Sequence, residues 1–407
     1  MAQTELLLKG GHVIDPKNGI SGPMDVAIGD GRVISVAPDI SEATAVKVVD
    51  VSGMYVTPGL IDMHVHVYSH HPFSDLGVVA DGQSFSSGIT TMVDAGTAGP
   101  ADFGHFKERV IDHSRTRILA FVNVVNLGMG GAFEQDVSRM QPQAAAGVAS
   151  AYPETVVGIK VAHYWTWQPY DDAHQPWDNV DRGVEAAEIC GKPLMVDFWP
   201  RPPERSYSQL ILEKMRPGDI HTHVFGQQFP IIKEDGQVNE ILFQARDRGV
   251  IFDVGHGAGS FWFRNAVRAI KGGFVPDSIS TDLHTGNAAN GLVTNLLNVM
   301  NKFLNMGLTV DDVIARTTVA PALEIRHPEL GTLGVGAEAD VAVFQLREGP
   351  CTFIDCGRAK MLGDKKLACM LTLRAGKVAY DPSGLTMPKW EDAPPEYWVC
   401  RQPSGRR

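Results

Sequence analysis

The chain has 407 residues, of which 44% are hydrophobic and 20% are charged. At roughly 150 residues per domain, this length predicts two or three structural units, and the composition excludes a globally disordered chain. Its 47 acidic residues outnumber the 36 basic ones and give a formal net charge of −11, so the chain lacks the broad basic surface that a nucleic-acid partner needs. No apolar run approaches the roughly 18 residues of a membrane span, and we expect no membrane partner.

The start of the chain and its cysteines indicate a cytoplasmic protein. The first residues, Met-Ala-Gln-Thr-Glu, lack the basic and apolar regions of a signal peptide. The five cysteines are few, odd in number and without a Cys-x-x-Cys pair, which is typical of unpaired thiols in a reducing compartment. We therefore predict a cytoplasmic location.

Both ends of the chain have the pattern of small β-structure. Short runs rich in Val, Ile and Leu lie at residues 6–9, 24–28, 32–36, 46–50, 340–346 and 371–380. Asp30-Gly31, between two of the early runs, is a hairpin signal because both turn positions require positive φ. The string at 9–16 also resembles the string at 374–382, although turn chemistry alone could produce this likeness. We predict one small composite β-sandwich domain formed by residues 1–57 and 335–407.

Between these ends, eight apolar runs of four to eight residues alternate with stretches of helical length. The runs lie at 60–67, 89–94, 118–125, 156–162, 194–198, 220–225, 250–254 and 278–283. Such strands are buried on both faces, so the pattern predicts an α/β fold, a (β/α)8 TIM barrel over residues 58–334. Near its end, Thr309 and Asp312 predict a helix capping box. A doubly wound sheet is the alternative, but no Gly-x-Gly-x-x-Gly follows an early strand.

Six of the eight predicted strands carry residues that are possible metal ligands. Imidazole or carboxylate groups close five of them and a lysine lies inside the fourth: His64, His66, Lys160, Asp197, His221, His223, His256, Asp282 and His284. Barrel enzymes place their chemistry at the carboxyl ends of strands, and these groups are usual ligands for zinc and its neighbours. Alternation along a strand puts His64 and His66 on one face. A lone histidine at a strand end is usually structural, but this set together predicts a metal centre.

One string around the first predicted strand is highly specific. Residues 57–66 read Thr-Pro-Gly-Leu-Ile-Asp-Met-His-Val-His, and further informative strings lie at 158–160, 222–223, 253–261 and 280–282. Together these strings resemble the amidohydrolase superfamily over essentially the whole chain. The string at 253–261 resembles the dihydroorotase-like branch that includes amidohydrolases of the deacetylase type.

The resemblance implies a site for two divalent metal ions, with zinc expected and manganese as the alternative. His64 and His66 would hold one ion with Asp282 as a further ligand, and His223 would hold the second. Lys160 would carry a carbamate formed from CO2 that bridges both ions. This agrees with the high cost of burying a free amine in an apolar strand.

The fifth predicted strand departs from the family pattern. It ends in Asp197, where the family has a metal-binding histidine. The carboxylate could supply an oxygen ligand, or it could hydrogen-bond a neighbour while the second ion is weak or absent. His221 could compensate from the strand face that it shares with His223, although packing deeper in the barrel is its expected role.

Residues that follow the fourth and fifth predicted strands are expected to shape a substrate pocket. Aromatic side chains there suit an apolar substrate group, although packing is the alternative: Tyr164, Trp165, Trp167, Phe198 and Trp199. Arg201 could hold a carboxylate through two hydrogen bonds, or it could lie in solvent. His163 and His256 complete the set of predicted substrate-binding residues.

These residues predict a hydrolase that cleaves an amide or ester bond of a small acylated amino or hydroxy acid. A metal-activated hydroxide would attack the scissile carbonyl, and Asp282, the predicted catalytic residue, would pass the proton to the leaving group. The alternatives are a cyclic amidohydrolase like dihydroorotase, a nucleobase deaminase and a non-catalytic barrel scaffold. We expect a small-molecule substrate as the partner, and a homo-oligomer would be ordinary for this class.

Overall fold

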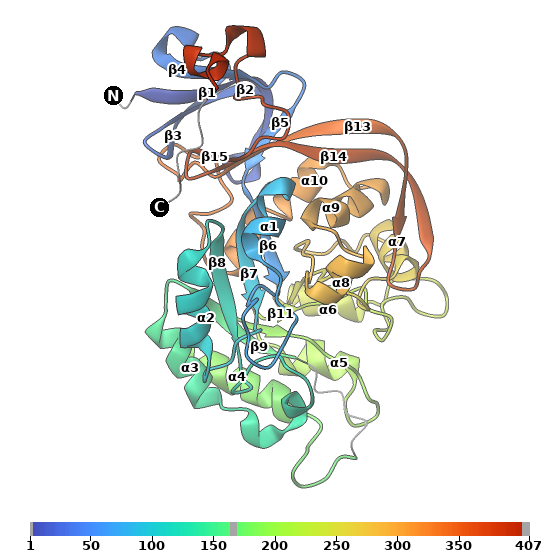
Figure 1. Cartoon of the computed structure of the whole chain (residues 1–407). Coiled ribbons are helices and arrows are strands. Elements are labelled where there is room, and N and C mark those ends of the chain that lie inside the picture. The colour runs from blue at the N-terminus through green and yellow to red at the C-terminus, as the bar shows by residue number, and fades with distance from the viewer. Residues whose placement is uncertain (1–2, 163–168, 401–407) are drawn as a thin grey trace.

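The computed structural model describes residues 3–162 and 169–400, which form two β-sheets with helices packed around them (Figure 1). Seven parallel strands form the first sheet, in the spatial order β12-β11-β10-β9-β8-β7-β6. They are β6 (Leu60–Val65), β7 (Ile89–Ala95), β8 (Arg117–Asn123), β9 (Val156–Val161), β10 (Leu194–Val196), β11 (Ile220–His221) and β12 (Ile251–Phe252). Every residue of β6, β7 and β9 is buried, as expected for strands with both faces covered.

The eighth predicted run closes this sheet into a barrel without being a regular strand. Single parallel bridges join Ser278 to Asp253 on one side and Leu283 to Val65 on the other. Asp282, within the run, has a φ of +48°, a left-handed conformation that interrupts a strand. The predicted α/β barrel is therefore confirmed, with an irregular eighth strand.

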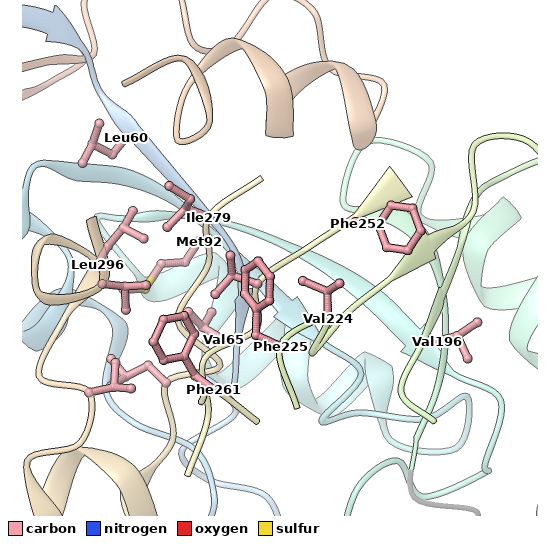
Figure 2. Close-up of a cluster of buried hydrophobic side chains, with 14 of the residues drawn as sticks. Leu60, Val65, Met92, Val196, Val224, Phe225, Phe252, Phe261, Ile279 and Leu296 are labelled. Atoms are coloured by element: carbon pink, nitrogen blue, oxygen red, sulfur yellow. The ribbon is translucent and has the colours of Figure 1, made fainter. Parts of the chain in front are cut away.

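Helices alternate with these strands along the chain. They are α1 (Ala80–Gln83), α2 (Phe103–Arg109), α3 (Pro142–Ala151), α4 (Asp178–Cys190), α5 (Tyr207–Gln209), α6 (Ile241–Asp247), α7 (Phe263–Lys271), α8 (Thr285–Asn290), α9 (Leu296–Asn305), α10 (Val310–Ala315) and α11 (Val319–Glu324). The largest hydrophobic cluster joins strand and helix residues, and Figure 2 shows Val65, Met92 and Leu296 within it. The predicted capping box at α10 is present. None of the helices in the described ranges is long and apolar enough to cross a membrane.

The second sheet is mixed and is built from both ends of the chain. Its strands follow the order β15-β14-β13-β5-β1-β2-β3, and β4 pairs with β1. They are β1 (Thr4–Asp15), β2 (Ile20–Gly29), β3 (Arg32–Ala37), β4 (Ala45–Asp50), β5 (Tyr55–Pro58), β13 (Val341–Ile354), β14 (Lys360–Arg374) and β15 (Lys377–Tyr380). Asp30 and Gly31 have φ of 50° and 70° at the predicted turn between β2 and β3. The composite β-structure is confirmed, and its boundaries at residues 57 and 335 stay a prediction.

The β13–β14 hairpin extends from the second sheet toward the segment that follows β12 (Figure 1). Along the way, Asn301 of α9 exchanges hydrogen bonds with the backbone of Leu367. At the tip, Asp355 Oδ2 accepts a hydrogen bond from Phe263 N at 2.9 Å, and Cys356 N donates to Phe261 O at 3.0 Å. A strand pair of the small sheet thus anchors the end of the 253–261 string.

Candidate metal centre and active site

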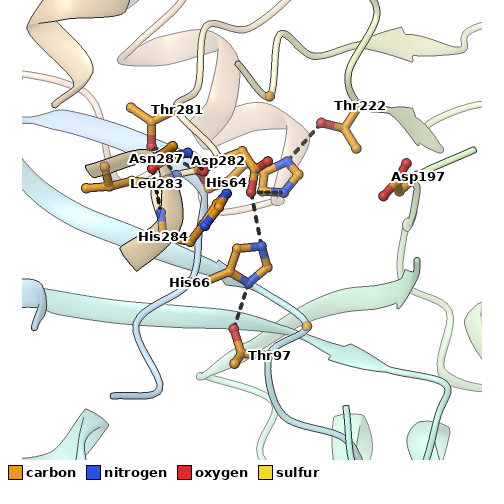
Figure 3. Close-up of polar contacts among 12 residues, drawn as sticks. His64, His66, Thr97, Asp197, Thr222, Thr281, Asp282, Leu283, His284 and Asn287 are labelled. Atoms are coloured by element: carbon orange, nitrogen blue, oxygen red, sulfur yellow. Dashed lines mark hydrogen bonds and ion pairs between the residues drawn. The ribbon is translucent and has the colours of Figure 1, made fainter. Parts of the chain in front are cut away.

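His64, His66 and Asp282 converge where β6 ends beside the closing segment of the barrel (Figure 3). His66 Nε2 lies 3.1 Å from Asp282 Oδ1, and His64 Nε2 lies 3.4 Å from the same oxygen. Ligand atoms of His64, His223 and Asp282 all lie within 4.8 Å of one another. Imidazole nitrogens and a carboxylate oxygen that point at one place form a donor set that fits a divalent metal ion.

The backbone at two of these residues is held in an unusual conformation. His223 and Asp282 have φ of +64° and +48°, which for residues other than glycine costs about 1–3 kcal/mol each. Asn287 Nδ2 donates to Asp282 O at 2.5 Å, and His223 Nδ1 lies 2.6 Å from Gly255 O. These bonds help to hold both side chains toward the shared centre. Strain of this kind is typical of functional sites.

The electrostatics of Asp282 favour its ionised form. Burial alone would raise its pKa, but the neighbouring His64 and His66 rings hold the pKa of this carboxyl well below its usual range. Burial also lowers the pKa of His64 to about 3. An ionised carboxylate is the protonation state that a metal ion requires of an aspartate ligand.

Lys160 lies on β9 beneath the same centre. Its side chain is 1% exposed, and its Nζ lies 3.5 Å from His64 Nε2. Burial lowers the pKa of this amine, and the charges of nearby carboxylates, first of all Asp197 and Asp282, oppose the shift only in part. Gly96 leaves room for it, because a Cβ there would come within 2.6 Å of Lys160 Cβ. Burial of a charged amine is costly, so this site favours a neutral or modified amine.

Asp197 follows β10 and faces the far side of the centre. Its Oδ2 lies 3.7 Å from His223 Nε2, and its side chain lines the same cavity as the histidines. The structure thus brings together His64, His66, Lys160, Asp197, His223 and Asp282, the whole predicted ligand set.

A cavity of about 640 Å³ opens above this set. Trp199 and Arg201, which follow β10, line it together with Gln228, Ser260 and His284. The Arg201 guanidinium stacks over the Tyr170 ring at 4.3 Å. The volume suits a small molecule, and the lining combines one large apolar surface with a cation.

Of the two other predicted substrate-binding residues, the structure describes only His256. His163, with the neighbouring Tyr164, Trp165 and Trp167, falls outside the described residues. His256 is fully buried and does not line the cavity. Its Nε2 lies 2.6 Å from Lys302 Nζ, its Nδ1 lies 3.0 Å from Gly257 O, and its ring stacks on Phe261. Packing behind the cavity wall is the role that these contacts support.

His221 is also a packing residue. Its Nε2 lies 3.0 Å from Tyr207 Oη, and its ring contacts Phe229 and Phe252. The expected location deeper in the barrel agrees with this placement.

Four buried residues that contact the histidines or continue their hydrogen bonds were not predicted from the sequence. They are Asp94, Thr97, Thr222 and Asp253. The two aspartates could have been found from the sequence, because each is a charged residue within a predicted apolar strand. The two threonines could not have been found in this way, since threonine is common at the end of a β-strand.

An α/β barrel that gathers histidines, an aspartate and a buried lysine at the carboxyl ends of its strands has the arrangement of an amidohydrolase. No protein-family model matches the chain. It is, however, 33% identical over 334 residues to a deacetylase of Brucella anthropi, covering 79% of this chain and 79% of that protein. A deacetylase of Agrobacterium fabrum is 32% identical over 342 residues, covering 81% and 80%. The chain therefore belongs to the amidohydrolase superfamily, in the family of these deacetylases.

Solved structures agree with this placement. The crystal structure of an adenine deaminase matches with a TM-score of 0.83 and 27% identity, covering 93% of this chain and 99% of that chain. The structure of a dihydroorotase matches with a TM-score of 0.80 and 28% identity, covering 93% and 98%. The barrel and the small sheet thus occur together in enzymes with different substrates, so the substrate has to be argued from the site itself.

Proposed function

We propose that this protein is a metal-dependent deacylase, which hydrolyses an amide or ester bond of a small acylated amino or hydroxy acid. The observation that carries the proposal is the convergence of His64, His66 and Asp282 above the buried Lys160, at the base of a cavity of small-molecule size. The names of the two deacetylase relatives support the same reaction class.

The residues present fit two divalent ions, and zinc is the first choice because three histidines are available. His64, His66 and Asp282 would hold one ion, and His223 with Asp197 would hold the other. The neutral amine of Lys160 would react with CO2 and lose a proton to form an anionic carbamate that would supply oxygen ligands to the ions, so no ammonium would be buried there. Ions bound there would acidify a water molecule and polarise the scissile carbonyl.

Asp282 would act as the general base and then as the general acid. Its Oδ1 would accept a proton from the attacking water and deliver it to the departing nitrogen or oxygen of the substrate. Its carboxylate is held ionised, so it is ready to accept that proton. The left-handed backbone at Asp282 fixes the side chain toward the centre before substrate arrives.

The cavity favours an acid with a bulky or aromatic side chain. Trp199 offers an apolar surface, and Arg201 offers the donors for one carboxylate. A nucleobase would stack on the tryptophan but would offer no anionic group to the guanidinium. The likeness to an adenine deaminase structure makes deamination the second candidate to test.

A substrate screen with defined metal content tests the proposal. The protein is loaded with zinc or manganese and offered N-acetyl amino acids, O-acetyl hydroxy acids, dihydroorotate and adenine. We expect acetate release from an acylated acid, abolished by Asp282→Asn at unchanged far-UV circular dichroism. Faster ammonia release from adenine than turnover of any acylated acid would refute the proposal.

A further inference from the structure

The two histidines at the end of β6 each lead into a buried hydrogen-bond relay (Figure 3). His66 Nδ1 lies 2.7 Å from Thr97 Oγ1, which in turn lies 2.8 Å from Asp94 Oδ2. Asp94 also accepts hydrogen bonds from the backbone N–H groups of Val67 and Thr97. This relay runs from the first strand of the barrel to the end of the second.

The second relay repeats the pattern on the other side of the site. His64 Nδ1 lies 2.8 Å from Thr222 Oγ1, and Thr222 Oγ1 lies 2.8 Å from Asp253 Oδ2. Ser280 and Ser278 also donate to Asp253, at 2.7 and 3.1 Å. The residues come from different strands, so the histidine-threonine-aspartate order arises only in the fold.

Counting hydrogens assigns a direction to each relay. A threonine hydroxyl has one hydrogen, and a carboxylate can only accept, so the hydroxyl hydrogens of Thr97 and Thr222 point to Asp94 and Asp253. Each threonine oxygen must then accept a hydrogen from the histidine Nδ1. The opposite nitrogen, Nε2, is left with its lone pair.

We propose that Thr97 and Thr222 are positioning residues that fix His66 and His64 in the Nδ1–H tautomer and so present both Nε2 lone pairs to the metal. This inference rests on the proposed function for its metal. Both Nε2 atoms already point at Asp282 Oδ1, at 3.1 and 3.4 Å. Loss of such a hydrogen-bond partner typically weakens metal binding by about 10–100-fold.

Burial makes each threonine hard to replace by solvent. Thr97, Thr222, Asp94 and Asp253 are all 0% exposed, so no bulk water reaches the histidine Nδ1 atoms. Without the hydroxyl of Thr97, the better arrangement for the His66 ring is the other tautomer, with Nε2–H donating to Asp282. That tautomer has no lone pair for a metal ion at Nε2. His64 would shift less without Thr222, because Asp253 Oδ2 lies 3.6 Å from its Nδ1.

His223 provides a control within the same molecule. Its Nδ1 lies 2.6 Å from the carbonyl oxygen of Gly255, which can only accept. Its tautomer is therefore set by the backbone and does not depend on either threonine hydroxyl.

The test replaces each threonine by a residue of the same shape without a hydroxyl. Thr97→Val and Thr222→Val should fold, because Asp94 keeps two backbone donors and Asp253 keeps two serine donors. Thr97→Ser and Thr222→Ser restore the hydroxyl. Thr317→Val is the matched control, since this buried threonine donates to Val313 O at the amino-terminal end of the barrel.

Two measurements are made on each variant. Nitrogen-15 NMR of histidine-labelled, metal-free protein at alkaline pH reports the tautomer of each ring, and competition with a chromophoric chelator reports zinc affinity. We expect Thr97→Val to move His66 toward Nε2–H and weaken zinc binding by about 10–100-fold. Thr222→Val should act on His64 in the same direction but less strongly, because Asp253 remains near its Nδ1, and both variants should leave His223 unchanged. The serine variants and Thr317→Val should remain within about threefold of the parent, because their relays keep a hydroxyl.

Two results separate this inference from the proposed function. Valine variants that keep both the parent tautomers and the parent zinc affinity would overturn the relay. A parent protein that binds no divalent ion would overturn the proposed function, while the tautomers of the metal-free variants would still decide the relay.

Discussion

At the scale of single residues, the site depends on side chains whose charge is set by burial. Lys160 shows this most clearly, because its amine lies buried in the barrel and its pKa is lowered. Asp282 is the opposite case: it is also buried, but neighbouring imidazoles keep it ionised. The same low-dielectric surroundings thus produce a reactive amine and a stable carboxylate a few ångströms apart.

Lys160→Ala should lose bound metal and lower activity by more than about 100-fold. Loss of a residue that only hydrogen-bonds a metal ligand costs about 10–100-fold, and Lys160 is proposed as a ligand itself. Short carboxylates such as acetate should restore part of both, since they can occupy the place of the carbamate. Metal content by elemental analysis and initial rates with and without acetate measure this. Acetate should leave the unaltered protein unchanged. A Lys160→Ala variant with full metal and full activity would show that Lys160 is not a bridging ligand.

Arg201→Met should raise KM by about 10–100-fold, the value of a lost charge-assisted hydrogen bond, and change kcat little. A carboxylate clamp remote from the reacting bond stabilises the ground and transition states alike, so its loss appears in KM. Steady-state kinetics on an acylated acid and on its carboxamide analogue measure the effect. The carboxamide should show almost no difference between the two enzymes. An equal rise in KM for both substrates would exclude the carboxylate contact.

At the scale of elements, a buried aspartate stabilises a β-bulge between β1 and β2 of the small sheet. The pairing of β1 with β2 shifts between Leu8 and Gly11, and Asp25 of β2 fills the gap. Asp25 accepts hydrogen bonds from Gly10 N, Ile40 N and Lys9 Nζ, each at 2.8 Å. Burial opposes its charge, but these three donors together lower the pKa of the Asp25 carboxyl.

Asp25→Asn should reduce the free energy of unfolding by about 1–2 kcal/mol at pH 7, because the amide loses charge-assisted hydrogen bonds. A carboxyl whose pKa is lowered on folding stabilises above the ordinary pKa of 3.8, and this stabilisation is lost as the pH falls through the lower folded-state value. The difference between parent and variant should therefore shrink below about pH 4. Urea unfolding at pH 7, 5 and 3 measures it. Asp39→Asn is the control, since this second Lys9 partner is 89% exposed and should contribute almost nothing. A difference that stays constant from pH 7 to 3 would contradict the explanation.

At the scale of the whole molecule, the barrel is closed by its last segment, which carries Asp282. Backbone hydrogen bonds run from His66 N to Leu283 O and from Asp282 N to His64 O, so the proposed metal ligands of β6 and of the closing segment are also neighbours across the closure. A metal ion held by both would therefore stabilise the closed barrel as well as the site.

Metal removal should lower the melting temperature by several degrees without changing far-UV circular dichroism. An ion at 100 times its Kd contributes about 2.7 kcal/mol, while the hydrophobic clusters remain intact in its absence. Calorimetry before and after dialysis against a chelator measures the shift, and added zinc should reverse it. His64→Asn should show a smaller chelator-dependent shift than the parent, because only the ion proposed at His223 and Asp197 would remain. Equal melting temperatures for the parent in both conditions would show that no ion bridges the closure.

The sequence by itself determined the architecture and which residues to propose as metal ligands. Apolar runs such as 89–94 and 156–162 are local patterns, and local patterns are sufficient for strands that are buried on both faces. His64 and His66 share a strand face through the two-residue period of a strand, and Asp282 lies near the end of the eighth apolar run. The turn at Asp30-Gly31 follows from backbone sterics alone.

Only the tertiary structure decided what each polar residue touches. His256 and Asp197 both end predicted strands, yet the fold buries His256 against Lys302 and leaves Asp197 lining the cavity. Thr222 reaches His64 across 158 residues of sequence, and no local pattern encodes that distance. The physical reason is that strand formation depends on the apolar character of near neighbours, whereas hydrogen-bond pairing depends on the register of strands far apart in the chain.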